Sequence, residues 1–395
     1  MKVVMATPCL YDSTSPFNHL LFDILNGLIS DGASLFRIVA TEDKRDRSYT
    51  MGIEGDAVTY CPVKRKSAPH ASIIKRYLLD SLCALRMARR IRKSGGTVLL
   101  EDVSYSSLFT VRAAKRRGMR VVAMLQDIWP DNAVASGLIR KGSFLYRFFE
   151  RRQSYVYKKA DKILCISDDM KRLLLSKGIE ESRIEVIYNW GYSDAPVDIP
   201  FEENAFAEKA GLYKDTFYAV YAGNIGRMQN VELVVAAAEL LKNNPGVEFL
   251  IIGDGARRGE IEAMVKAAKL PNVRMLPLQP SSLATSLYCA AGVNLIPLVK
   301  DGIQTAMPSK TPVVLSCGRP TVFAFGRDCG FAETVAGREG LFAVSCEDAR
   351  ELADTITEIY RERPSARGAH ELFSLLFSQK ENVRRYVAAL RGDEA

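Results

Sequence analysis

The chain has 395 residues, which exceeds what one ordinary hydrophobic core supports, so we expect two domains. Hydrophobic residues make up 48% of the sequence and charged residues 25%, which excludes a disordered chain, and no apolar run approaches the roughly 20 residues of a membrane-spanning helix. The net charge of +8 is unevenly distributed, because ten Lys or Arg residues and a single acid, Asp80, lie between Lys64 and Lys93.

The first half of the chain alternates short β-branched strands with amphipathic helices. Its first residues predict a buried strand rather than a signal peptide. The expected strands are 3–6, 36–40, 98–100, 121–125, 162–166 and 184–188, and the expected helices are 20–31, 72–93, 106–117, 145–159 and 168–177. The apolar side expected for helix 72–93 comprises Ile74, Tyr77, Leu78, Leu82, Leu85, Ala88 and Ile91.

A polar, proline-containing segment from Asp194 to Glu203 predicts a linker, after which a second alternating series begins. Its expected strands are 217–222, 248–252, 273–277, 293–297 and 320–324, and its expected helices are 231–243, 257–268, 281–291, 310–317, 348–362 and 369–390. Such alternation predicts an α/β fold of two doubly wound parallel sheets facing across a cleft. In this class of fold, ligands bind at the carboxyl ends of the strands.

The eight cysteines and three histidines are dispersed along the chain. No Cys-x-x-Cys pair occurs, and no histidine stands at metal-ligand spacing from a cysteine. We therefore expect reduced, mostly buried thiols in a cytoplasmic protein.

Three turns of the second half carry anion-binding chemistry. The turn Gly223-Asn224-Ile225-Gly226-Arg227 follows a strand and precedes a helix, so backbone N–H groups and a guanidinium can meet a phosphate there. Gly253-Asp254-Gly255 ends the next strand, and Pro308-Ser309-Lys310 supplies a hydroxyl and a cation before another helix. Taken alone, the first and third turns are equally compatible with a purely structural role, and the Gly-Asp-Gly turn favours one. Together, at successive strand ends, they predict one site for a diphosphate.

These three turns, followed by Cys317-Gly318-Arg319-Pro320, resemble the C-terminal half of the retaining glycosyltransferases of family four. The first half carries matching segments, namely Gln126-Asp127-Ile128-Trp129-Pro130, residues 160–167 and residues 186–191. The resemblance spans nearly the whole chain in the expected order. It implies a GT-B fold, with an acceptor-binding domain over 1–193, a nucleotide-sugar-binding domain over 204–368, and a C-terminal helix at about 369–395 that packs back on the first domain.

The resemblance also assigns roles to single residues. Arg227 matches the family's pyrophosphate-binding arginine, and Lys310 is expected to supply the second positive charge beside Pro308 and Ser309. Gln279 falls in the turn where the base edge is usually recognised. In the first domain, Asp127 is the candidate for orienting an acceptor hydroxyl, and its alternative role is a helix cap or a structural ion pair. The remaining candidate substrate-binding residues are Gly223, Asn224, Gly226, Gly253, Asp254, Thr305, Gln126, Ser15 and Asn18.

Several positions depart from the family pattern. The family's Glu-x7-Glu pair would fall on Thr305 and Val313, so both carboxylates are absent. A lysine common six residues after Arg227 is replaced by Leu233. The loop containing Ser15 and Asn18 lacks the usual paired glycines. Gln126 stands where many members have a histidine, and glutamine can donate hydrogen bonds but cannot exchange protons.

The resemblance therefore implies a metal-independent, retaining glycosyltransferase that needs no cofactor and uses a nucleoside-diphosphate sugar, with UDP as the expected nucleotide. The expected acceptor is a glycan or a lipid-linked molecule in surface polysaccharide or glycolipid synthesis. Two alternatives stay open, a non-catalytic GT-B subunit that binds a partner glycosyltransferase or a glycan, and a nucleotide-sugar 2-epimerase. The basic segments between Lys64 and Lys93 and between Arg140 and Lys159 interleave cations with apolar residues. They predict peripheral binding to the anionic inner face of the cell membrane, or else simply solvated faces, and no nucleic acid is expected.

Overall fold

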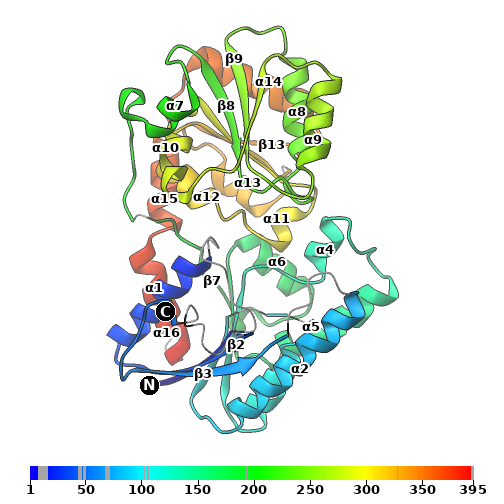
Figure 1. Cartoon of the computed structure of the whole chain (residues 1–395), viewed down its shortest axis with the longest axis vertical. Coiled ribbons are helices and arrows are strands. Elements are labelled where there is room, and N and C mark those ends of the chain that lie inside the picture. Colours follow the sequence, from blue (N-terminus) through cyan, green and yellow to red (C-terminus); the bar gives the residue numbers. More distant parts are fainter. Residues whose placement is uncertain are drawn as a thin grey trace. The chain divides into compact units, whose positions relative to one another are not determined.

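The computed structural model describes residues 1–7, 17–42, 47, 50–66, 72–101, 103–104, 106–192, 194–326 and 328–392. Within these residues the chain forms two compact units (Figure 1). The first unit comprises residues 1–133, 139–188 and 380–395, and the second comprises residues 134–138 and 189–379. Each unit is built on one parallel sheet, which confirms the predicted α/β class.

The sheet of the first unit has seven parallel strands in the order β3-β2-β1-β4-β5-β6-β7. The strands are β1 (Lys2–Thr7), β2 (Ser34–Thr41), β3 (Val58–Lys64), β4 (Thr97–Leu100), β5 (Arg120–Leu125), β6 (Lys162–Cys165) and β7 (Ile184–Val186). At its centre Val4 pairs with Phe36 on one side and Val98 on the other. The inner strands are buried along nearly their whole length, as expected for a sheet with helices on both faces.

Six helices of eight residues or more, and one shorter helix, accompany this sheet. They are α1 (Phe17–Ser30), α2 (Ile73–Ile91), α3 (Leu108–Lys115), α4 (Asp131–Ala135), α5 (Phe144–Lys159), α6 (Asp168–Ser176) and α16 (Gln379–Arg391). The last helix is tied to the sheet, because Asn382 Nδ2 donates a 2.9 Å hydrogen bond to the Tyr188 carbonyl and Arg120 donates one of 2.6 Å to the Ala389 carbonyl.

The apolar side predicted for helix 72–93 is only partly correct. Leu78, Leu82 and Leu85 are exposed on α2 rather than buried. The buried side is built instead from smaller or unbranched residues, namely Ser81, Cys83, Ala84, Met87 and Ala88, together with Ile91. Small side chains let α2 lie close to its neighbours, so the larger leucines are directed outward. The side chain of Ile74 lies outside the described residues.

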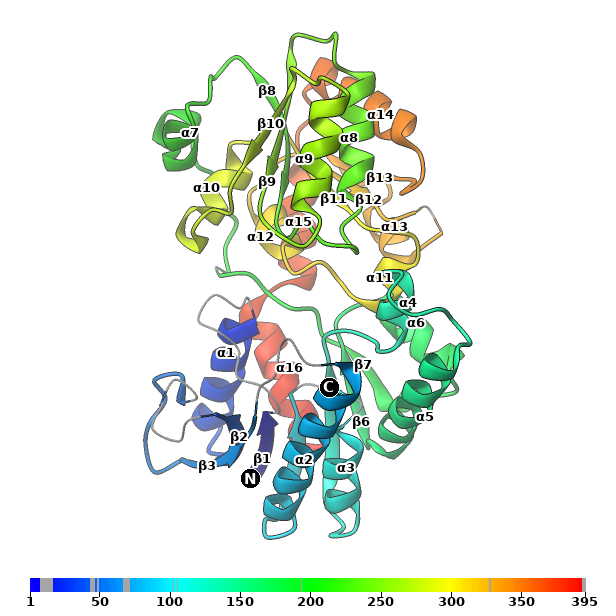
Figure 2. The same cartoon turned by 45° about the vertical axis from the view of Figure 1, so that its right-hand side comes forward.

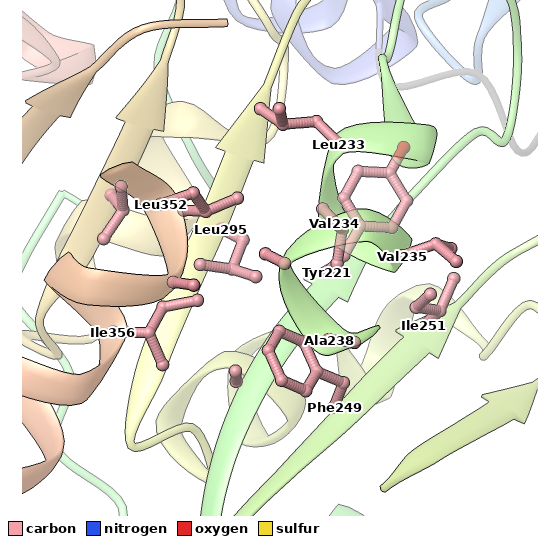
Figure 3. Close-up of a cluster of buried hydrophobic side chains, with 14 of the residues drawn as sticks. Tyr221, Leu233, Val234, Val235, Ala238, Phe249, Ile251, Leu295, Leu352 and Ile356 are labelled. Atoms are coloured by element: carbon pink, nitrogen blue, oxygen red, sulfur yellow. The ribbon is translucent and has the colours of Figure 1, made fainter. Parts of the chain in front are cut away.

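The sheet of the second unit has six parallel strands in the order β10-β9-β8-β11-β12-β13. The strands are β8 (Phe217–Ala222), β9 (Val247–Ile252), β10 (Val273–Leu276), β11 (Val293–Pro297), β12 (Thr321–Ala324) and β13 (Leu341–Val344). Its α-helices are α7 (Ala205–Ala210), α8 (Val231–Leu240), α9 (Arg258–Ala267), α10 (Ala284–Cys289), α11 (Gly302–Thr305), α12 (Thr311–Ser316), α13 (Gly330–Val335), α14 (Ala349–Glu362) and α15 (Arg367–Leu376). Figure 3 shows the core in which α8 and α14 bury Val234, Leu352 and Ile356 against β8, β9 and β11.

Several elements differ from those expected, and the short helices α4, α7 and α13 are among those that were not predicted. The strands β3 and β13 were not expected; β3 contains Pro62, which a strand tolerates at the edge of a sheet, where this one lies. The helix expected over 369–390 is two helices, α15 and α16, separated at Phe377 and Ser378.

In the part of the chain that the structure describes, none of the helices is both long and apolar enough to traverse a bilayer.

Candidate functional site

Two of the predicted turns interlock at the carboxyl edge of the second sheet. The backbone N–H of Gly223, directly after β8, donates a 2.9 Å hydrogen bond to the Ile252 carbonyl. The N–H of Ile225 donates one of 2.8 Å to the carbonyl of Asp254, in the turn after β9. The turns 223–227 and 253–255 therefore form one connected backbone structure.

Glycine is required where these turns meet. Gly253 has a φ of +150°, and a Cβ atom there would stand 1.8 Å from the Gly223 carbonyl oxygen. Gly255 has a φ of +154°, and its Cβ would stand 2.5 Å from both Asn224 Oδ1 and the Ile225 oxygen. Any larger residue would push the two turns apart.

Lys310 reaches this edge from the residue before α12. Its Nζ atom donates a 2.9 Å hydrogen bond to the carbonyl of Ala222 and lies 3.8 Å from the centre of the Tyr221 ring. The same atom would be 3.6 Å from a Cβ on Gly223. The predicted grouping of Lys310 with the turn at Gly223 is therefore present in the structure.

The ammonium of Lys310 has only neutral partners within the described part of the chain, a carbonyl oxygen and an aromatic face. Burial lowers the pKa of Lys310 to about 7, because a charged amine loses hydration there without gaining a carboxylate. A bound anion would supply the missing negative charge.

Tyr221 and Tyr288 hydrogen-bond to the backbone at the turn that begins at Gly223. Neither tyrosine was singled out in the sequence. The Tyr221 hydroxyl donates a 2.5 Å hydrogen bond to the Asn224 carbonyl, and the Tyr288 hydroxyl donates one of 3.3 Å to the Ala222 carbonyl. Burial raises the pKa of both phenols, so they remain neutral donors. A tyrosine at the end of a buried strand gives no signal that distinguishes this role from packing.

The other candidates of the second unit lie around this edge. Arg227 and Asp254 are exposed, and Asn224 Nδ2 donates a 3.3 Å hydrogen bond to Gln229. Gln279 is half-buried and donates a 2.8 Å hydrogen bond to the Pro277 carbonyl. Of the remaining candidates, Gly226 is buried, Pro308 is half-buried and Ser309 is exposed.

Three of the positions that depart from the family pattern, Thr305, Val313 and Leu233, are buried. Thr305 is 3% exposed, and its hydroxyl donates a 2.9 Å hydrogen bond to the Gly302 carbonyl. Val313 is buried on α12. Leu233 is 7% exposed and belongs to the core shown in Figure 3. Apolar or short side chains therefore fit the packing at all three places.

In the first unit, Gln126 and Asp127 directly follow β5. Asp127 is exposed, and its Oδ2 atom accepts a 2.7 Å hydrogen bond from Asn132. Desolvation by neighbouring protein atoms raises the pKa of Asp127 to about 6, against the opposing effect of Asn132. Gln126 is half-buried, as is Asn18 on α1, whereas Ser15 lies outside the described residues.

A buried ion pair between Arg37 on β2 and Glu101, which directly follows β4, was missed in the sequence. Arg37 Nη2 lies 3.3 Å from Glu101 Oε2, which also accepts a 2.6 Å hydrogen bond from Thr7 Oγ1. Burial opposes the charge on Arg37, but Glu101 and, to a smaller extent, Tyr60 together outweigh it and raise the pKa of Arg37. A lone arginine in one apolar strand and an acid just after another strand give no sequence signal that they will pair across a sheet.

Among the residues that the structure describes, no group of three or more His, Cys, Asp or Glu side chains could hold a metal ion.

Comparison with known proteins relates both units to one class of enzyme. Residues 23–190 match the family described as "Glycosyl transferase 4-like domain", and residues 216–362 match "Glycosyl transferases group 1". The chain is 27% identical over 244 residues to the probable glycosyltransferase WbjE of Pseudomonas aeruginosa, covering 60% of this chain and 59% of that protein. It is 28% identical over 217 residues to the putative colanic acid biosynthesis glycosyl transferase WcaI of Escherichia coli K12, covering 52% of this chain and 51% of WcaI. The matched part thus spans only slightly more than half the length of these relatives.

Solved structures share the whole architecture. Sucrose-phosphate synthase from Thermosynechococcus elongatus aligns with a TM-score of 0.75 at 15% identity, covering 99% of this chain and 98% of that one. Anabaena HepE in complex with UDP and glucose aligns with a TM-score of 0.72 at 14% identity, covering 99% and 100%. At this level of identity the likeness establishes the fold.

Proposed function

Because this chain belongs to the glycosyltransferases of GT-B fold, we propose that it transfers a sugar from a nucleoside-diphosphate sugar, with UDP as the nucleotide, to a glycan or lipid-linked acceptor. We further propose that the transfer retains the anomeric configuration and needs no metal ion. The name of WcaI, a putative colanic acid biosynthesis glycosyl transferase, favours a place in surface polysaccharide synthesis. We propose that it acts in the cytoplasm.

One observation carries this proposal, namely the approach of Lys310 to the interlocked turns after β8 and β9. A diphosphate bound at this edge would place its charge beside a partly dehydrated ammonium, backbone N–H groups and the exposed guanidinium of Arg227. Charge that develops on the leaving diphosphate would be neutralised there, which is the largest single contribution in many transfer reactions.

The proposed chemistry requires little acid–base machinery. As the bond between the anomeric carbon and the diphosphate oxygen breaks, the acceptor oxygen forms the new bond on the same face of the sugar. The acceptor's proton passes to the leaving diphosphate oxygen. In this proposal Asp127 orients the acceptor hydroxyl, and Gln126 hydrogen-bonds a sugar hydroxyl without exchanging protons.

A second candidate is a non-catalytic subunit that keeps the fold and binds a partner enzyme or a glycan. The observation that favours it is the burial of Thr305 and Val313 at the positions where the family carries its two glutamates. Lys310 argues against it, because its amine loses hydration beside a carbonyl oxygen and an aromatic ring without gaining a negative charge, which a bound diphosphate would supply.

Release of free nucleoside diphosphate from a panel of UDP, GDP and ADP sugars separates these candidates. We expect turnover with a UDP sugar, and stabilisation by UDP against thermal unfolding through mass action. NMR of the product would then distinguish transfer from 2-epimerisation and would establish the anomeric configuration. If no nucleotide stabilises the protein and none is released, the chain is a non-catalytic subunit and not a glycosyltransferase.

A further inference from the structure

A stripe of leucines lies on the exposed side of α2. Leu78, Leu82 and Leu85 are 55%, 49% and 40% exposed, and their spacing of four and three residues places them on one side of the helix. Exposed cations continue the same stripe at each end, Lys75 before it and Arg89 after it. Helices of a soluble domain normally bury such residues, whereas a leucine stripe framed by cations is typical of a helix lying at a lipid interface.

A basic hollow of about 540 Å³ lies between α3 and α5. Four arginines line it, Arg112, Arg147, Arg151 and Arg152, and no carboxylate is among its lining residues. None of the four forms an ion pair with a described residue of the chain, and two of them lie over aromatic rings. The guanidinium of Arg112 is 4.8 Å from the centre of the Tyr155 ring, and that of Arg152 is 4.5 Å from the centre of the Phe148 ring.

A second basic hollow, of about 510 Å³, lies between β3 and the C-terminal half of α2. It too has no carboxylate among its lining residues. The cations that line it are Lys64, Arg86, Arg89, Arg90, Arg92 and Lys93. Two separate hollows with unpaired cations fit a surface that offers many anionic headgroups rather than one ligand.

Helices α2 and α5 belong to one continuous surface of the first unit. The rings of Tyr77 on α2 and Phe148 on α5 meet edge to face with their centres 5.5 Å apart, and Arg152 lies over both rings. Figure 2 shows α2, α3 and α5 in a row on the same side of the unit. At the start of α5, Phe144 is 86% exposed.

We infer that this surface docks on an anionic lipid bilayer. The docking surface consists of Leu78, Leu82, Leu85, Arg112, Phe144, Arg147, Arg151 and Arg152. Its arginines bind lipid phosphates, and its leucines and Phe144 insert among the acyl chains. The leucines favour a bilayer over a nucleic acid, because a phosphodiester backbone offers no apolar layer to receive them. The inference deepens the proposed function, on which it rests for its purpose, because it brings the enzyme to a lipid-linked acceptor.

Flotation of the full chain with vesicles tests the inference. We expect binding to vesicles that contain phosphatidylglycerol, little binding to pure phosphatidylcholine vesicles, and release at high salt. The variant Arg147→Gln/Arg151→Gln should lower the partition coefficient about fivefold for each cation removed, roughly 25-fold in all. The variant Leu82→Ser should lower binding and leave the salt dependence in place.

Matched controls come from the second unit. Lys242→Gln/Arg361→Gln removes two exposed cations, and Leu375→Ser removes an exposed leucine, and neither should change vesicle binding. UDP binding, measured by calorimetry without vesicles, should be the same in all of these proteins. Equal flotation of wild type, Arg147→Gln/Arg151→Gln and the controls would overturn the inference, and so would salt-insensitive binding or binding to soluble polyanions alone. Such a result leaves the proposed function intact, because that function fails only if UDP is neither bound nor released.

Discussion

The Nζ atom of Lys310 donates a 2.9 Å hydrogen bond to the carbonyl oxygen of Ala222, the last residue of β8. This contact joins the residue before α12 to the turn that begins at Gly223. It leaves a buried amine with an uncharged partner, and burial accordingly lowers the pKa of Lys310 to about 7.

The low pKa predicts that UDP binding takes up a proton. With this pKa, Lys310 of the free protein should be mostly neutral at pH 8, and the diphosphate should raise its pKa toward the ordinary value of 10.5. Affinity should therefore fall as the pH rises above about 7, by up to roughly tenfold per pH unit. Calorimetry at pH 8 in two buffers of different ionisation enthalpy measures this uptake directly. Lys310→Gln should bind UDP more weakly and without proton uptake, and an unchanged uptake in that variant would contradict the assignment.

Arg227→Ala should lose most of its turnover. One oriented charged contact is worth about 2–4 kcal/mol at a transition state, which corresponds to roughly 30- to 1,000-fold in rate. Because Arg227 is exposed, the melting temperature should not change. Release of nucleoside diphosphate is the measurement, with Arg361→Ala as the matched loss of an exposed arginine. A rate near that of the wild type would remove Arg227 from the proposed site.

Asp127→Asn should lose activity without losing stability. The pKa of Asp127 is raised to about 6 in the folded protein. Above that pH the ionised carboxylate therefore lowers the free energy of unfolding, and this destabilisation disappears as the pH falls toward 3.8. An amide avoids the cost, and the variant should melt at or above the wild-type temperature at pH 7.5. If the carboxylate orients the acceptor, the wild-type rate should also decline below about pH 6. If Asp127→Asn kept the wild-type rate and still showed the decline below about pH 6, Asp127 would have a structural role.

The strand-to-helix turns were the most predictable part of the molecule. Gly223, Gly253 and Lys310 could be grouped from sequence because parallel strands place their carboxyl ends at one edge, so turns far apart in the chain meet there. Helix α2 shows where pattern reasoning failed. Its leucines repeat at helical spacing, but periodicity alone does not say whether small or large residues face the sheet, and here Ala84 and Ala88 do.

The buried pair of Arg37 and Glu101 could not be predicted for a different reason. Arg37 is a single charge in the apolar strand β2, whereas Glu101 directly follows β4 and is next to a second acid, Asp102. The strands β2 and β4 are separated by β1 in the sheet. Only the three-dimensional order of the strands brings Arg37 and Glu101 together with Thr7.

This pair makes a prediction about stability. Arg37→Met should lower the free energy of unfolding by about 3–5 kcal/mol, because Glu101 would remain as an uncompensated buried charge. The double variant Arg37→Met/Glu101→Gln should recover much of that loss. Chemical denaturation followed by circular dichroism measures both. Equal losses in the single and double variants would mean that packing around Arg37, rather than its charge, stabilises the first unit.

Gly253 and Gly259 offer a comparison that tests the interlocked turns. Gly253→Ala introduces a Cβ only 1.8 Å from the Gly223 carbonyl oxygen, at a φ of +150° that side chains rarely adopt. We expect the free energy of unfolding to fall by at least about 2 kcal/mol, and UDP affinity to fall as the turns after β8 and β9 separate. Gly259→Ala makes the same chemical change within α9, where no atom lies within 4 Å of the new Cβ. It should stabilise the protein by up to about 1 kcal/mol and leave UDP binding unchanged. If Gly253→Ala bound UDP as tightly as Gly259→Ala, the phosphate would have to bind elsewhere on the second unit.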